Sequence, residues 1–145
     1  MTDINKTTDI RCRGIIIYDD KILVVKHSSK SKYYALPGGH LDWGESVLDC
    51  MSREIIEELG IKPKIGRLLY VRNYIDNNMK QSIEFHFEIT NSKDYLKIED
   101  LGGTHRHELA EIYWMKKNDT KNLKPKEIQI DFNNNTILSD IVKFS

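Results

Sequence analysis

The sequence has little cysteine, no excess of charge of one sign and no long apolar run, and each shortage excludes a class of protein. The two cysteines, Cys12 and Cys50, share no spacing typical of a zinc site or a disulfide framework. Because Cys12 falls in a strand-like run and Cys50 in a helix-like one, we expect two buried free thiols. No stretch approaches the roughly 20 apolar residues of a membrane-spanning helix. The first ten residues are polar, so we expect no secretory signal, no membrane partner and a cytoplasmic location.

Basic and acidic residues balance. Lys plus Arg and Asp plus Glu each number 22, which gives a formal net charge of +0. Binding of long nucleic acid by counterion release normally requires a basic excess, so we expect no such partner. A small phosphorylated substrate is not excluded, because a metal ion can neutralise its charge locally. At 145 residues the chain supports one core, and we predict a single domain over residues 1–145.

The hydrophobic pattern predicts strands on either side of one central helix. Residues 81–89 alternate most clearly, with phenylalanines on one face and Glu84, His86 and Glu88 on the other. A tight turn is expected at Asp19-Asp20, and a hairpin turn at 76–80. The predicted strands cover residues 12–18, 22–27, 65–75, 81–89 and 111–116.

The last third of the chain has weaker signals. Residues 91–110 are expected to form a long loop with room for a short irregular strand. Residues 135–144 are expected to form an amphipathic helix capped by Asn135 or Thr136. Together these elements predict an α/β fold, in which helices pack on the faces of a mixed sheet.

The central helix is predicted over residues 45–59. Ser46 or Gly44 is suited to cap its start, and Gly60 stands where a helix-ending glycine is usual. The apolar positions of this segment predict the face that packs on the sheet: Leu48, Met51, Ile55, Ile56 and Leu59. The opposite arc carries three carboxylates, those of Glu54, Glu57 and Glu58.

Three glutamates at this spacing repel one another by a few tenths of a kcal/mol per pair. Two explanations are open: an acidic solvent face, or a site for a strongly positive ligand. Arg53 can neutralise only one carboxylate, and residues 45–61 contain no lysine. The preceding Pro-Gly-Gly-His at 37–40 offers flexible backbone that can turn a carbonyl towards a ligand. Carboxylate and carbonyl oxygens suit Mg²⁺, which favours the second explanation.

The segment from Gly39 to Ile61 is similar to the signature of the Nudix hydrolase family. That signature is Gly, five residues, Glu, seven residues, Arg-Glu, an apolar residue, any residue, Glu-Glu, any residue, Gly and an apolar residue. Every fixed position is matched over these 23 residues. The resemblance implies a Nudix-type α/β/α sandwich with a mixed β-sheet, whose loop–helix–loop binds Mg²⁺, with Mn²⁺ as the alternative.

The resemblance also implies roles for the matched residues. Glu57, Glu58 and the carbonyl of Gly39 correspond to metal ligands. Glu54 corresponds to a ligand or to the group that activates the attacking water. Arg53 would orient these carboxylates and take part in catalysis, while Glu45 would brace the loop. The implied reaction is attack of water on the diphosphate of a nucleoside diphosphate linked to another group.

Candidate residues outside the signature are fewer. Relatives with this signature often take a further acidic ligand or base from a loop before a Trp. Glu108, six residues before Trp114, is the preferred match, whereas Glu111 is explained by pairing with a neighbouring lysine. The glycine-hinged segment 102–108 is either a surface loop or a lid that carries Arg106 or a histidine to a phosphate.

We also expect Arg72, Asn73, Tyr74 and His86 to line the substrate cleft. Tyr33, Tyr34 and Tyr74 are candidates to stack on a base, with ordinary packing as the alternative for each.

The substrate is less clear than the reaction. Subfamily markers, a proline or a tyrosine 15 to 18 residues after the signature, are absent. ADP-ribose, cleaved to AMP and ribose 5-phosphate, is the first choice because a compact site suits a small nucleotide sugar. The alternatives are a nucleoside triphosphate pyrophosphatase, a non-catalytic nucleotide-binding module and processing of RNA 5′ ends. The resemblance also allows a homodimer.

Overall fold

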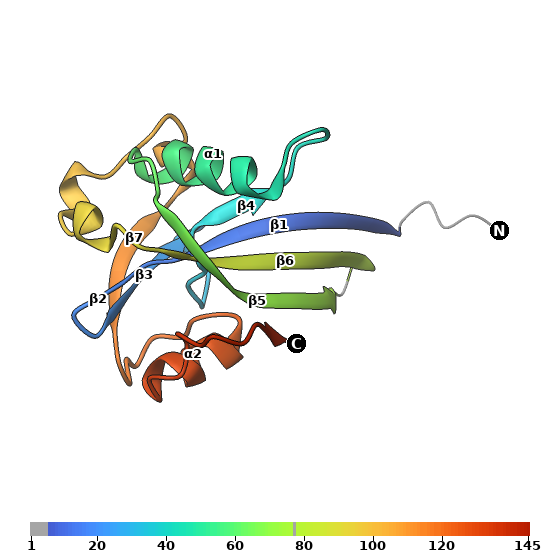
Figure 1. The fold of residues 1–145 in the computed structure, drawn as a ribbon. Helices are drawn as coiled ribbons and strands as arrows, with labels where there is room; N and C mark the ends of the chain where they lie inside the picture. The colour runs from blue at the N-terminus through green and yellow to red at the C-terminus, as the bar shows by residue number, and fades with distance from the viewer. Residues whose placement is uncertain (1–5, 77) are drawn as a thin grey trace.

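The computed structural model describes residues 6–76 and 78–145, and two helices lie on opposite faces of a mixed sheet (Figure 1). The predicted α/β/α arrangement is therefore confirmed. Three single-turn 3₁₀ helices also occur, at Ser92–Tyr95, Ile98–Asp100 and Arg106–Glu108. The main elements are β1 (Thr7–Ile15), β2 (Ile17–Tyr18), β3 (Lys21–Lys26), β4 (Gly38–His40), α1 (Val47–Leu59), β5 (Ile65–Ile75), β6 (Lys80–Ile89), β7 (Glu111–Lys116), α2 (Lys126–Asn133) and β8 (Lys143–Phe144).

Five strands form the main sheet in the order β4-β1-β6-β5-β8, and three form a second sheet in the order β2-β3-β7. β1 runs parallel to β6 and antiparallel to β4, which places it between these two strands, next to the edge strand β4. The core has two parts. One, around Met51 and Ile55, packs α1 on one face, and the other, around Ile128 and Phe132, packs α2 on the opposite face. Among the described residues, no helix is long and apolar enough to cross a membrane.

Local sequence signals explain several elements. Asp19 and Asp20 both have positive φ, of 50° and 61°, as the tight turn between β2 and β3 requires. The strands predicted at 65–75 and 111–116 match β5 and β7, and β6 begins one residue earlier than predicted. The hairpin turn predicted at 76–80 includes Asn77, which lies outside the described residues. Cys12 and Cys50 are buried free thiols, as predicted.

The C-terminal helix prediction was wrong. The helix lies earlier, at α2, where Ile128 and Phe132 supply the buried i, i+4 pair. The tail instead adds β8 beside Tyr70 and Val71 at the sheet edge. In the segment predicted to be helical, Ile137 is buried but Leu138 and Ile141 are exposed, so its apolar spacing does not correspond to one packed face.

Three further predictions need correction. Residues 91–110 contain 3₁₀ turns and no strand. The glycine pair at 38–39, described above as flexible backbone and given no strand, forms β4 against β1. On α1, Leu48 and Ile56 are exposed, whereas Cys50 and Glu58 are buried with Met51, Ile55 and Leu59. The buried face is therefore rotated towards Glu58, which does not lie on the solvent arc.

Candidate active site

The ends of α1 are fixed by two capping residues, and the three glutamates lie between them. Ser46 caps the start by accepting a hydrogen bond from the backbone N–H of Asp49 at 3.1 Å. Gly60 ends the helix with φ of 82°, and its N–H donates to the carbonyl of Ile56. Between these caps, Glu54 and Glu57 occupy the half-buried margin of the helix, and Glu58 points into the protein.

Arg53 connects the carboxylates of this region. Its guanidinium binds Glu45 through two hydrogen bonds of 2.7 and 3.0 Å, and Nη1 donates to Glu54 at 2.9 Å and to Glu57 at 3.2 Å. A further bond, from Nη2 to the carbonyl of His40, joins the helix to the preceding loop. The hydrogen bond from Arg53 lowers the pKa of Glu45 to about 2, so Glu45 is an anion at neutral pH. This geometry fits an orienting role for Arg53 and a bracing role for Glu45.

Glu58 lies against the signature loop. Its side chain is buried, with 4% of the residue exposed, and Oε1 accepts the backbone N–H of Gly38 at 2.7 Å. Burial raises the pKa of Glu58 to about 7, against the lowering effect of that hydrogen bond and of the Arg13 charge. A buried carboxylate with raised pKa is suited to a cation, because a positive ligand would restore the stability of its charged form.

The Glu54 carboxyl closely approaches the backbone of Gly39. A Cβ at position 39 would lie 2.5 Å from the Glu54 carboxyl, so only glycine fits here without displacing that group. Burial also raises the pKa of Glu54, while Arg53 opposes the shift. The backbone of Gly39 and the carboxyl of Glu54 therefore share one small space, as a common ligand would require.

The segment 102–108 is docked onto the C-terminal end of α1. Backbone N–H groups of Gly102 and His105 donate to the carbonyls of Leu59 (3.0 Å) and Glu57 (2.7 Å). Gly103 lies so close that a Cβ there would be 1.9 Å from the Ile56 carbonyl oxygen. These contacts satisfy helix-end carbonyls that otherwise lack partners. The segment is thus held to the helix by its backbone.

This docking brings a histidine and a further glutamate to the cluster. Nδ1 of His105 lies 3.0 Å from Oε2 of Glu57 and 3.9 Å from Oε2 of Glu108. Glu108 therefore stands at the edge of the glutamate cluster. Arg106 is placed differently, because its Nη1 donates to the carbonyl of Leu109 at 2.7 Å. It stabilises its own 3₁₀ turn, and the structure does not bring it into the cleft.

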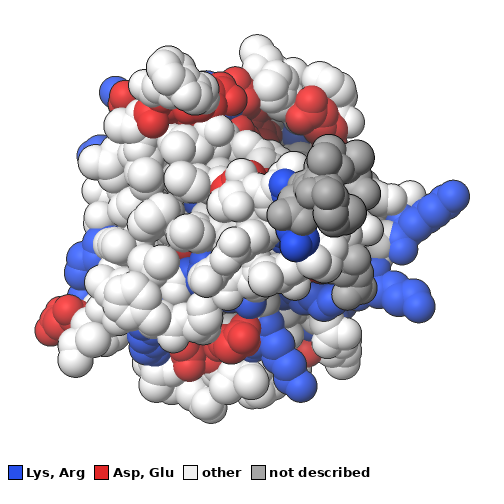
Figure 2. Space-filling model, turned by 90° about the vertical axis from the view of Figure 1, so that its right-hand side faces the viewer, with Lys and Arg blue, Asp and Glu red and all other residues white. Residues whose placement is uncertain are grey.

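The donor set suits a hard divalent cation, since it consists of carboxylate and carbonyl oxygens. Within residues 6–76 and 78–145, no three His, Cys, Asp or Glu side chains form a ready-made ion cage. Mg²⁺ does not require one, because it usually binds one or two carboxylates and completes its shell with waters and substrate phosphates. Figure 2 shows acidic side chains along the top edge of the molecule, on the side of α1.

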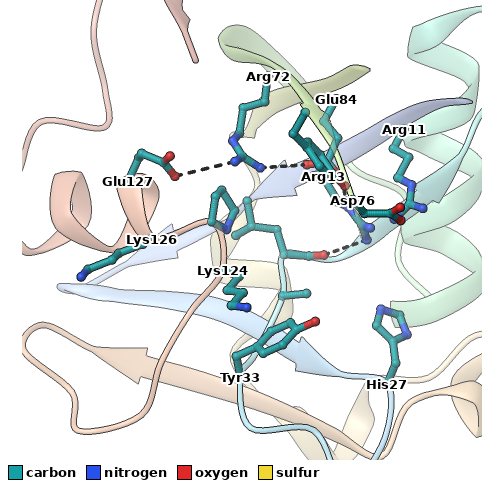
Figure 3. A pocket seen from close by; sticks show the side chains of 14 residues that line it. Arg11, Arg13, His27, Tyr33, Arg72, Asp76, Glu84, Lys124, Lys126 and Glu127 are labelled. Atoms are coloured by element: carbon teal, nitrogen blue, oxygen red, sulfur yellow. Dashed lines mark hydrogen bonds and ion pairs between the residues drawn. The ribbon is translucent and has the colours of Figure 1, made fainter. Parts of the chain in front are cut away.

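A cleft of about 660 Å³ lies on the sheet face opposite α1 (Figure 3). The predicted residues Arg72 and Tyr74 line it, and so does Tyr33. Tyr34 is buried in the core. His86 was expected to line the cleft but is fully buried beneath it, where Nε2 lies 3.1 Å from Glu84. His86 therefore supports the floor and does not face a ligand.

Sequence reasoning missed the most basic part of this cleft. Arg11, Arg13, His27, Lys124 and Lys126 all line it, together with Glu84. One signal was available: Arg11 and Arg13 are two residues apart on one strand, so both must point to the same face. The pairing of that strand with Glu84 and His86 was not apparent, because parallel β1–β6 pairing joins residues more than 70 positions apart.

Glu84 is expected to stabilise the fold at neutral pH and to lose this effect in acid. Burial alone would raise its pKa, but the hydrogen bond from His86 and the charge of Arg13 outweigh burial and lower that pKa to about 2, from 4.5. The lowered pKa corresponds to about 3 kcal/mol, fully present above pH 4.5 and lost as pH falls towards 2. Urea unfolding of the wild type and of Glu84→Gln at several pH values measures this contribution to the free energy of unfolding. We expect their difference in stability to shrink between pH 5 and 2.5, and a constant difference contradicts this assignment.

Comparison with known proteins agrees with the signature. The NUDIX domain pattern matches residues 9–133. An ADP-ribose pyrophosphatase of Methanocaldococcus jannaschii is 42% identical over 67 residues, which are 45% of this chain and 40% of that protein. The match thus spans less than half the length of this relative.

Two solved structures share the fold. A MutT protein of Methanosarcina mazei Go1 has a TM-score of 0.70 at 21% identity, covering 90% of this chain and 96% of that one. A MutT NUDIX hydrolase of Burkholderia pseudomallei has a TM-score of 0.68 at 24% identity, covering 86% of this chain and 96% of that one. Because the NUDIX domain match extends over most of the sequence, this chain belongs to the Nudix family.

Proposed function

We propose that this chain is a divalent-metal-dependent pyrophosphohydrolase that cleaves the diphosphate of a nucleoside diphosphate linked to another group. The observation that carries the proposal is the Arg53-centred glutamate cluster. Through Glu58, Gly38 and Arg13 it is joined by hydrogen bonds to a cleft large enough for a nucleotide.

Glu54, Glu57, Glu58 and the carbonyl of Gly39 would hold the ion, with Glu108 as a further ligand. Mg²⁺ is the first choice because all of these donors are oxygen atoms. When bound, the ion screens the diphosphate charge and lowers the pKa of coordinated water. Arg53 keeps the carboxylates aligned through its hydrogen bonds.

Proton transfer requires a carboxylate near the cluster. Glu54 and Glu108 are the two candidates. Glu54 is half-buried and burial raises its pKa, which makes it the better proton acceptor. Glu108 is exposed and reaches the cluster beside His105. A carboxylate in either place can take the proton of the attacking water and release it to solvent.

We propose ADP-ribose as the substrate, cleaved to AMP and ribose 5-phosphate. Support comes from the 42% identity to an ADP-ribose pyrophosphatase over a region of 67 residues. The test is a panel of ADP-ribose, nucleoside triphosphates and dinucleoside polyphosphates with Mg²⁺, with products identified by chromatography. AMP and ribose 5-phosphate from ADP-ribose, at the highest kcat/KM of the panel, is the expected result. Faster release of diphosphate from a triphosphate would replace this assignment, and no turnover of any member would favour a non-catalytic binding module.

A further inference from the structure

Arg13 lies where the cleft meets the signature loop. It is on β1, where its neighbour Cys12 faces α1 and Arg13 itself faces the cleft. In the sheet it is paired with Gly38 of β4 on one side and His86 of β6 on the other. Its place is therefore set by two strand pairings and does not depend on a loop.

Most of the Arg13 guanidinium is held by fixed acceptors. Nη1 donates to the carbonyls of Leu36 and Gly38 at 3.3 and 3.2 Å, and Nε lies 3.6 Å from Oε2 of Glu84. Nη2 has no hydrogen-bond partner within the described part of the chain, and it is not among the buried atoms that lack one. Nη2 is therefore not fully buried, and Arg13 is one of the residues that line the cleft (Figure 3).

Gly38 joins Arg13 to the glutamate cluster. Its carbonyl accepts from Arg13, while its N–H donates to Glu58 at 2.7 Å. The guanidinium and the Glu58 carboxylate are thus bound to the same residue. Arg13 therefore lies close to a ligand whose diphosphate is held at the cluster and whose remaining part occupies the cleft.

We propose that Nη2 of Arg13 binds an anionic oxygen of the substrate diphosphate, and that Glu84 is the positioning residue that aims Arg13. The inference rests on the proposed function and deepens it, because it names the group that meets the phosphate charge on the cleft side. A guanidinium is suited to this task, since its N–H donors are fixed in one plane and can serve structural and ligand acceptors together.

Both carboxylate oxygens of Glu84 already have protein partners. Only 5% of the residue is exposed, and its oxygens accept from His86 and from the Tyr74 hydroxyl, both at 3.1 Å. Arg13 and Arg72 lie 3.6 and 3.8 Å away. Glu84 therefore has little capacity to bind a ligand. Its position between the two arginines indicates that it holds their guanidinium groups in place.

This assignment makes a prediction about sign. Glu84→Gln removes a negative charge from a cleft that binds an anion, so net charge alone would strengthen binding. If Glu84 acts by aiming Arg13, the same substitution weakens binding, because the guanidinium loses its anchor. The direction of the change distinguishes positioning from simple electrostatics.

The experiment uses α,β-methylene-ADP, whose P–C–P bridge cannot be hydrolysed, titrated calorimetrically in Mg²⁺. We expect Arg13→Lys to raise Kd about 10-fold, since lysine keeps the charge but lacks the planar guanidinium that spreads its donors between the two carbonyls and a ligand. Glu84→Gln is expected to raise Kd about 3- to 10-fold. The matched controls are Arg67→Lys and Glu88→Gln, an exposed ion pair on the neighbouring strands outside the cleft, which should leave Kd unchanged.

Thermal unfolding establishes whether each variant folds. If Glu84→Gln does not fold, the Kd of Arg13→Lys alone tests the inference. With a turned-over substrate, both variants should raise KM more than they lower kcat. Tighter binding by Glu84→Gln, an unchanged Kd in Arg13→Lys, or no binding by the wild type at millimolar concentration overturns the inference. A binding pattern as expected, without hydrolysis of any substrate, supports the inference and removes the proposed activity.

Discussion

Glu57→Gln is expected to lower kcat by at least about 100-fold while the protein remains folded. The carboxylate is proposed to bind the ion that carries the reaction, and an amide is a much weaker ligand for a hard cation. The side chain is partly exposed, and its protein contacts are the ion pairs with Arg53 and His105 at 3.2 and 3.0 Å. Ion pairs near the surface typically contribute about 1 kcal/mol or less, so stability should change little. Steady-state hydrolysis and thermal unfolding measure the two effects.

Asp49→Asn is the matched control for this substitution. Asp49 is an exposed acid in the first turn of the same helix, two turns from Glu57. Losing its charge near the helix N-terminus costs about 0.3–1 kcal/mol and should leave kcat unchanged. Equal turnover by Glu57→Gln and the wild type would remove the catalytic role of Glu57.

Gly103→Ala is expected to reduce both activity and stability. A methyl group at this position would meet the carbonyl oxygens of Ile56 and Glu57 at 1.9 and 2.4 Å, and both are backbone atoms that cannot move without distorting α1. The segment must therefore lift from the helix, taking His105 and Glu108 away from Glu57. Overpacking of this kind costs about 1–3 kcal/mol. We expect a loss of at least about 10-fold in kcat, because a displaced group no longer assists the reaction.

Thr104→Ala separates this steric effect from a general sensitivity of the segment. Thr104 is the next residue and is exposed, so its truncation should leave kcat and the urea midpoint near wild-type values. Hydrogen exchange of the His105 amide, which donates to the Glu57 carbonyl at 2.7 Å, gives a direct readout of docking. If the His105 amide were protected from exchange as strongly in Gly103→Ala as in the wild type, the segment would still be docked on α1, which would contradict this prediction.

The elements nearest the signature were predictable because their signals are local. Ser46 and Gly60 mark the ends of α1 through short-range hydrogen bonds and backbone geometry. Strand-like runs identified β5, β6 and β7, and the alternation was clearest in β6. The spacing of Glu54, Glu57 and Glu58 identified the candidate site. Which of these glutamates is buried was not predictable, because that depends on β4, whose Gly38 supplies the partner of Glu58.

The remaining features depend on contacts between distant residues. Parallel pairing of β1 with β6 places Arg13 beside His86 and Arg11 beside Glu84, which creates the cleft floor. The tail forms β8 because the edge of β5 is free to pair with it, through Tyr70 and Val71. The sequence of residues 135–144 contains no sign of this free edge. The buried position of His86 has the same origin, since its neighbours Arg13 and Tyr70 are brought to it by the pairing of β6 with β1 and β5.

The central claim is that the glutamates of α1 bind a divalent cation together with the substrate diphosphate. Calorimetric titration of Mg²⁺ into the protein saturated with α,β-methylene-ADP tests it most directly. We predict saturable uptake by the wild type and at least a 10-fold weaker affinity in Glu57→Gln, with Asp49→Asn unchanged. Absence of Mg²⁺ and Mn²⁺ uptake by the wild type, or the same affinity in Glu57→Gln, would contradict the account.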